Sequence, residues 1–100
     1  SVAFGHPPPT VPLLGFEVAA RQDIKTDEHL FLRFKSHNGS RTLRAKAGNF
    51  AERAAELVRG SRVDVALQFE DDAYSAARGY APWQAILKDV RAATMVVHAR

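Results

Sequence analysis

The sequence predicts a mainly β fold, a five-stranded Greek-key barrel with one α-helix between its third and fourth strands. Two observations predict this class. Apolar and polar residues alternate in several short segments, which is the pattern of half-buried strands. In the middle of the chain the apolar period lengthens to that of a helix, and the alternation then returns.

The first twelve residues, SVAFGHPPPTVP, contain four prolines and a glycine. Proline lacks the backbone N–H that a helix or a central strand needs, so residues 1–12 are predicted to form a proline-rich linker. The chain starts with Ser rather than Met, and we therefore expect a fragment of a longer protein. The folded domain is expected over residues 13–92.

Alternation before the midpoint predicts three strands, at residues 13–21, 29–36 and 41–47, with a polar turn from Gln22 to Glu28. The second and third are joined through Asn38-Gly39, a pair that readily takes the positive φ of a tight hairpin turn. The positions predicted to face the core are Leu14, Phe16, Val18, Ala20, Leu30, Leu32, Phe34, Leu43, Ala45 and Ala47.

The predicted helix covers residues 49–59. Asn49 is a good N-cap, Glu52 completes a pair like a capping box, and Gly60 ends the helix. Two more strands are predicted at 61–70 and 83–91, joined by a long loop over 71–82. The tail, residues 93–100, shows no single pattern, and one interpretation is a short extra strand at 95–97. Inward positions of the fourth strand are Val63, Val65, Leu67 and Phe69.

Three strands, a helix and two strands, in that order, are typical of the OB-fold. Several function classes are disfavoured. The chain has no Cys, which removes disulfides, thiolate metal sites and Cys nucleophiles. No apolar run approaches the length of a membrane span, and we expect a cytoplasmic protein. The histidines match no metal-binding spacing and no catalytic motif is readable, so we expect no enzyme activity, metal or cofactor in this chain alone.

The strongest functional pattern lies on the second and third predicted strands, which form the ligand face of OB-folds. No acidic residue occurs between Glu28 and Glu52. Cations that follow phosphates, beside a ring that stacks on a base, are typical of single-stranded nucleic-acid binding. The alternatives are a ring packed under a loop or against another domain, and cations that only aid solubility. The residues predicted to face outward are Phe31, Arg33, Lys35, Arg44 and Lys46.

The predicted loop over 71–82 is rich in aromatic residues. Tyr74, Arg78 and Tyr80 are candidates for further contacts with nucleic acid. The alternative is that Trp83 and Tyr80 close the mouth of the barrel as part of the core, and this is the expectation for Trp83.

Several strings together resemble the OB domain that follows the catalytic core in RecJ-type single-stranded-DNA exonucleases. They are FGHPPPTVPLLGFEV, RTLRAKAGNFAERAAEL, GSRVDVALQFE and ILKDVR, and they span residues 4–92. The matching positions are Phe4, Gly5, Pro7, Pro9, Gly15, Ala45, Ala47, Ala51, Glu52, Gly60, Val63, Asp64, Asp89, Val90 and Arg91. The chain departs from the family pattern at His6, where Asn is usual, and at Gly48, where an aromatic is usual.

The resemblance implies a parent enzyme that degrades single-stranded DNA from 5′ to 3′ in recombination and repair. It also implies that manganese or magnesium is bound by the preceding domains, whose motifs do not occur here. The OB domain would then hold the strand for that core. The alternative is an interaction domain that packs the same face on its own nuclease core or on another protein.

Overall fold

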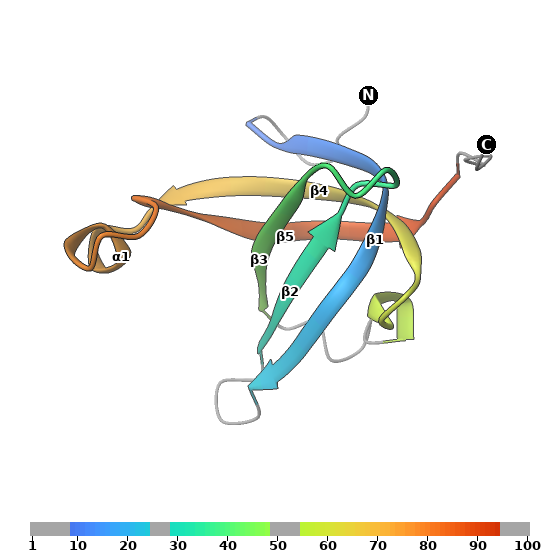
Figure 1. Cartoon of the computed structure of the whole chain (residues 1–100), viewed down its shortest axis with the longest axis horizontal. Coiled ribbons are helices and arrows are strands. Elements are labelled where there is room, and N and C mark those ends of the chain that lie inside the picture. Colours follow the sequence, from blue (N-terminus) through green and yellow to red (C-terminus); the bar gives the residue numbers. More distant parts are fainter. Residues whose placement is uncertain (1–8, 25–28, 49–54, 95–100) are drawn as a thin grey trace.

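The computed structural model describes residues 9–24, 29–48 and 55–94, and they form a closed barrel with strand order β1-β2-β3-β5-β4 (Figure 1). This order confirms the predicted five-stranded, OB-like barrel. β3 and β5 close it as a parallel pair, whereas the other neighbours are antiparallel. The elements are β1 (Val11–Ile24), β2 (His29–Lys35), β3 (Thr42–Gly48), β4 (Arg62–Asp71), α1 (Ala73–Ala77) and β5 (Trp83–Ala92).

The hairpin between β2 and β3 forms where the Asn-Gly pair predicts it. Gly39 has a φ of 74°, and its N–H donates to the carbonyl of Ser36 at 2.8 Å. The side-chain oxygen of Asn38 accepts hydrogen bonds from the backbone and hydroxyl of Ser40 at 3.0 and 2.7 Å. This turn sets the β2–β3 register, and the register decides which residues share a face.

The barrel interior is filled by aliphatic side chains and one phenylalanine. The predicted inward positions of β2 and β3 are confirmed, except that Leu43 is only partly buried. Burial of this apolar surface is the main term that stabilises so small a domain. The core residues are Val18, Leu30, Leu32, Phe34, Ala45, Ala47, Leu57, Val63, Val65, Leu67, Ala85, Leu87 and Val90.

The first strand is longer and less regular than the alternation predicts. β1 begins at Val11, so the linker predicted over 1–12 ends earlier than its predicted boundary; residues 1–8 lie outside the described part. The β1–β4 register shifts between Leu13 and Phe16. Leu13 packs against the core, and Leu14, predicted to face inward, is 42% exposed. A bulge reverses which side chains point inward.

The predicted helix over 49–59 falls largely outside the described residues, which resume at position 55. Within them, residues 55–57 form a single 3₁₀ turn rather than an α-helical one, and Leu57 from this turn is fully buried. Gly60 ends the segment with a φ of 91°, and its N–H donates to the carbonyl of Val18 at 2.8 Å.

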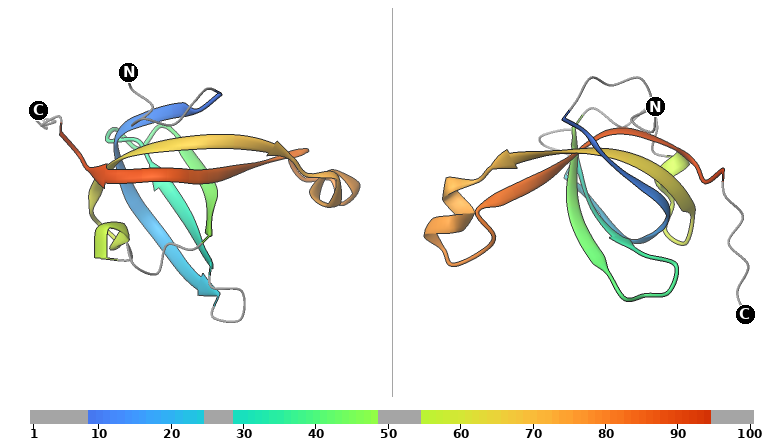
Figure 2. Two further views of the ribbon diagram at one scale, coloured as in Figure 1. Left: turned by 180° about the vertical axis from the view of Figure 1, so that it is seen from behind. Right: turned by 90° about the horizontal axis from the view of Figure 1, so that it is seen from above.

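The segment over 71–82 is not simply a loop, because it contains α1. The last residues of β4 and the first of β5 extend beyond the barrel as a two-stranded arm, and α1 lies at its tip (Figures 1 and 2). Asp72 caps α1 by accepting hydrogen bonds from the N–H and hydroxyl of Ser75 at 3.0 and 2.7 Å. The bond from the Ser75 N–H lowers the pKa of Asp72.

Phe69 was predicted to face the core and is 42% exposed. It lies beyond the part of β4 that pairs with β1, and its ring packs edge-on against Trp83. The extra strand predicted at 95–97 lies outside the described residues. Among the residues that are described, no helix has both the length and the apolar character of a membrane span.

Candidate functional site

The outer face of the β2–β3 hairpin brings together the five residues predicted to form a ligand face. Residues directly opposite each other in antiparallel strands point to the same side of the sheet. The alternate positions of both strands are buried in the core, except for Leu43, which is partly buried. The opposed pairs on the outer face are Phe31 with Lys46, Arg33 with Arg44, and Lys35 with Thr42.

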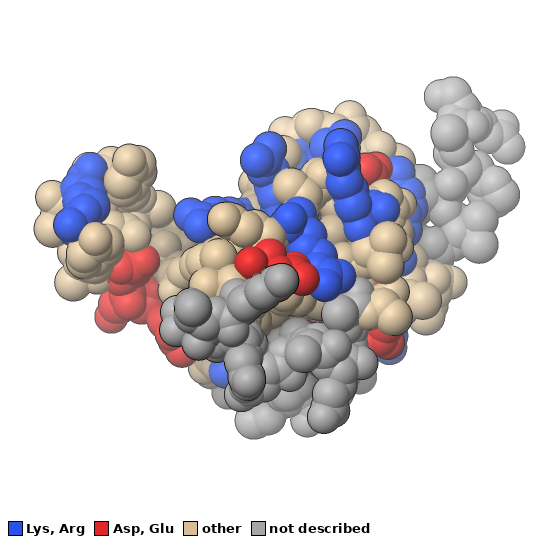
Figure 3. Space-filling view, turned by 90° about the horizontal axis from the view of Figure 1, so that it is seen from below, with Lys and Arg blue, Asp and Glu red and all other residues tan. Residues whose placement is uncertain are grey.

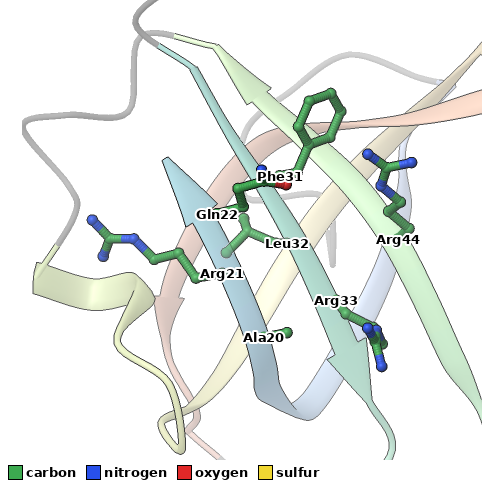
Figure 4. A pocket seen from close by; sticks show the side chains of 7 residues that line it. All are labelled: Ala20, Arg21, Gln22, Phe31, Leu32, Arg33 and Arg44. Carbon is green, nitrogen blue, oxygen red and sulfur yellow. The ribbon is translucent and has the colours of Figure 1, made fainter. Parts of the chain in front are cut away.

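The ring of Phe31 is half-buried by side chains of its own sheet. The guanidinium carbon of Arg44 lies over the ring, 4.3 Å from its centroid, in a cation–π contact. The ring of His29 meets it edge-on, with centroids 5.1 Å apart. Figure 4 shows Phe31 and Arg44 projecting from neighbouring strands beside the same hollow. One cation of the outer face therefore already covers the Phe31 ring.

A shallow hollow of about 140 Å³ lies beside Phe31. The β1 register shifts between Val18 and Ala20, and this bulge places Ala20 and Gln22 across from Arg33 and Phe31. No residue pattern marks this bulge, and Arg21 and Gln22 are therefore not among the site residues that the sequence predicts. The lining residues are Ala20, Arg21, Gln22, Phe31, Leu32, Arg33 and Arg44 (Figure 4).

Arg21 has a fixed geometry at the edge of this hollow. Its guanidinium donates two hydrogen bonds to the carboxylate of Asp23, at 2.7 and 2.9 Å. The hydrogen bond with Asp23 raises the pKa of Arg21 above its usual value. Part of the positive charge of Arg21 is therefore neutralised locally, and the cations of β2 and β3 dominate the face.

A second, larger hollow of about 360 Å³ lies between β3 and the arm. The described register joins β3 to β5 at only two positions, Ala45 with Ala85 and Lys46 with Ile86. Toward Thr42 and Trp83 the two strands diverge, and the hollow occupies the space between them. Its lining residues are Thr42, Leu43, Arg44, Ser75, Tyr80, Ala81, Trp83, Gln84 and Ala85.

Trp83 lines this second hollow and is not part of the core, which corrects the prediction that it closes the barrel mouth. Its side chain is 43% exposed, and its ring packs edge-on against Phe69 with centroids 5.2 Å apart. Both rings lie on the arm, where the barrel does not cover them. Tyr80 lines the same hollow and is 71% exposed; its contact with nucleic acid stays a prediction.

The other two predicted residues form a separate pair at the tip of the arm. The guanidinium carbon of Arg78 lies 3.5 Å from the centroid of the Tyr74 ring, and the two residues come from α1 and its C-cap. Neither lines the two hollows. Tyr74 and Arg78 are thus available to a ligand only if it extends along the arm.

Charge is unevenly distributed over the surface. Figure 3 shows Lys and Arg side chains spread over the barrel with smaller acidic groups among them, and further acidic groups on the arm beside a basic group near its tip. Glu70 and Asp71 end β4 and are exposed. In the described part of the chain, no group of three or more His, Cys, Asp or Glu side chains is arranged to hold a metal ion. The site is therefore suited to contacts with an anionic, ring-bearing ligand.

Comparison with known proteins finds no match to any family, to any curated protein or to any solved structure.

Proposed function

We propose that this chain is a single-stranded DNA-binding OB domain. The observation that carries the proposal is the register of β2 and β3, which sets the half-buried ring of Phe31 among four cations on the outer face. Cations follow the phosphates of a strand by releasing counterions, and an aromatic ring stacks on a base whatever its identity. The four cations are Arg33, Lys35, Arg44 and Lys46.

We further propose that the domain belongs to a RecJ-like 5′–3′ exonuclease acting in recombination and repair, and holds the strand for a catalytic core outside this chain. The resemblance in sequence carries this part, and one contact supports it. Three of its matching positions meet, because Asp64 accepts hydrogen bonds from Gly15 N and Arg91 Nε. These three positions lie together in the fold, and this is the structural observation that supports this part of the proposal.

In this proposal the chain is not an enzyme by itself. Hydrolysis, and the manganese or magnesium that assists it, belong to the parent's catalytic domains. The residues Phe31, Arg33 and Arg44 bind and orient the strand, and no residue of this chain takes part in bond cleavage.

The test is a fluorescence-anisotropy titration of a labelled oligothymidylate over a series of salt concentrations. We expect log K to fall linearly with log salt, with a slope of roughly −0.7 for each phosphate neutralised. A nuclease assay with manganese on the same sample is expected to be blank. Absence of binding at low salt contradicts the proposal.

The second candidate is an interaction domain that packs on its own nuclease core or on another protein. In this alternative the partner covers the β2–β3 face itself. The start of β1 offers further apolar side chains for such a contact, since Val11 and Leu14 are 41% and 42% exposed. For this candidate, Leu14→Ser weakens association with the parent's nuclease domains and leaves oligonucleotide binding unchanged.

A further inference from the structure

Arg44 belongs to both hollows. Its side chain lines the hollow beside Phe31 and also the larger one between β3 and the arm. In the structure its guanidinium carbon lies 4.3 Å from the centre of the Phe31 ring. A group that borders two sites and covers the aromatic surface of one of them is placed to respond to occupancy of both.

The larger hollow has the size and lining of a nucleotide site. Its volume of about 360 Å³ lies within the roughly 300–1,000 Å³ of ordinary ligand pockets. Trp83 and Tyr80 supply exposed rings, which every nucleobase can stack on. Thr42 and Gln84 add a hydroxyl and an amide group of the kind that can hydrogen-bond to base edges, whereas the Ser75 hydroxyl already donates to Asp72. A flat, polar-edged ligand fits this combination better than an aliphatic one.

We propose that the hollow between β3 and the arm binds a second nucleotide, next to the one that stacks on Phe31, and that Arg44 binds the phosphate between them. The inference rests on the proposed function and adds to it a second base site and a bridging residue. It predicts a minimal ligand of two linked nucleotides.

The position of Arg44 without ligand is part of the proposal. A base cannot stack on the ring face that the guanidinium covers, so the first base displaces Arg44 from Phe31. Stacking of a base on an aromatic ring contributes more than an exposed cation–π contact, and the exchange is therefore favourable. The released guanidinium, which already borders the second hollow, then pairs with the phosphate that leads into it.

Trp83 is a natural fluorescent probe of the hollow between β3 and the arm. Trp83 is the only tryptophan in the sequence, so intrinsic tryptophan fluorescence reports on this hollow alone. The ligands are thymidine monophosphate, the dinucleotide dTpdT and a longer labelled oligothymidylate. We expect dTpdT to quench Trp83 and to bind at least about tenfold more tightly than the mononucleotide, because linkage makes the second binding event intramolecular.

Three variants separate the roles of the residues. Arg44→Met keeps an unbranched stem without the charge, and we expect it to abolish the advantage of dTpdT over the mononucleotide. Arg44→Lys retains the charge and is expected to keep most of that advantage. Arg33→Met is the matched control, because Arg33 lies opposite Arg44 but lines only the hollow beside Phe31. Arg33→Met should weaken binding of the longer oligothymidylate and leave unchanged the ratio of the affinities for dTpdT and the mononucleotide. Thermal unfolding of each variant confirms that it is folded.

The outcomes distinguish this inference from the proposed function. If anisotropy reports binding of the longer strand while Trp83 fluorescence stays unchanged, the second site is wrong and strand binding stands. If Arg44→Met retains the dinucleotide advantage, Arg44 does not bridge the two nucleotides. If the longer strand does not bind at all, the proposed function fails, and this inference with it.

Discussion

The carboxylate of Asp64 accepts a hydrogen bond of 2.9 Å from the backbone nitrogen of Gly15, forty-nine positions earlier in the chain. Its other oxygen accepts hydrogen bonds from Arg91 Nε at 3.2 Å and from the N–H and hydroxyl of Thr94 at 3.2 and 3.1 Å. Only 1% of Asp64 is exposed. One buried carboxylate thus joins β1, β4 and the residues at the end of β5. The contact with β1 lies within its irregularity between Leu13 and Phe16.

We expect Asp64→Ala to destabilise the domain by about 1–3 kcal/mol, because it leaves the buried N–H of Gly15 without an acceptor and removes the carboxylate that Arg91 and Thr94 bind. Asp64→Asn should lower the free energy of unfolding by less. Its amide oxygen can still accept the hydrogen bond from the Gly15 N–H, although the charge is lost. Urea unfolding measures both. Asp71→Asn, an exposed position on the arm, is the control and should be nearly neutral. Equal stability of Asp64→Ala and the wild type contradicts this role.

The same contacts predict a dependence of stability on acid. Burial alone would raise the pKa of Asp64, but the hydrogen bonds from Gly15, Thr94 and Arg91 outweigh it and lower the pKa below its usual value. The stabilisation is therefore complete above the unfolded-state pKa, about 3.9, and is lost as pH falls through the lower folded-state pKa. Melting temperatures of wild type and Asp64→Asn should converge in that acidic range.

Strand pairing between neighbours in sequence could be predicted because local chemistry fixes it. The turn at Asn38-Gly39 sets the register of β2 and β3, and strict alternation along both strands then assigns every side chain to a face. Phe31, Arg33 and Arg44 were placed correctly on the outer face for this reason. Their binding of nucleic acid stays a prediction.

Features that depend on distant strands could not be predicted. Alternation tells which side of a strand a residue is on, but not whether another strand covers that side. Phe69 and Trp83 have the pattern of core residues, yet the arm carries both beyond the barrel. The β1 bulge between Val18 and Ala20 is likewise set by pairing with β2, and no residue in the sequence marks it. The helix α1 was missed because a segment of five residues has too little periodicity to detect.

Gly60 and Gly48 form a matched pair for a test of backbone strain. A Cβ atom at either position would meet no atom within 4 Å, but only Gly60 has a positive φ, of 91°. We expect Gly60→Ala to destabilise by about 1–2 kcal/mol because L-residues disfavour that conformation. Gly48→Ala should be neutral or slightly stabilising. Chemical denaturation compares the two, and an equal effect at both positions contradicts the assigned cause.

The cations of the ligand face are expected to act through phosphates. Arg33→Ala and Lys46→Ala should each weaken binding for every sequence and make the salt slope shallower by roughly 0.7. Arg59→Ala is the control, because Arg59 lies in the turn before β4 rather than on the β2–β3 face. Anisotropy over a salt series measures all three. If Arg59→Ala changes the affinity and the salt slope as much as Arg33→Ala does, the cations act through the overall charge of the domain and not through a defined face.

Phe31 and Phe34 lie on opposite sides of the same strand, and this makes them the sharpest comparison. Phe31 borders the outer hollow, whereas Phe34 is fully buried. If the Phe31 ring stacks on a base, Phe31→Leu costs about 1–3 kcal/mol of binding, and the salt slope stays unchanged. Phe34→Leu instead lowers folding stability by roughly 0.5–3 kcal/mol and leaves the affinity of the folded fraction intact. Melting and binding are measured for both variants. Should Phe31→Leu behave like Phe34→Leu, its ring serves packing alone, and the interaction-domain candidate becomes the better account of this face.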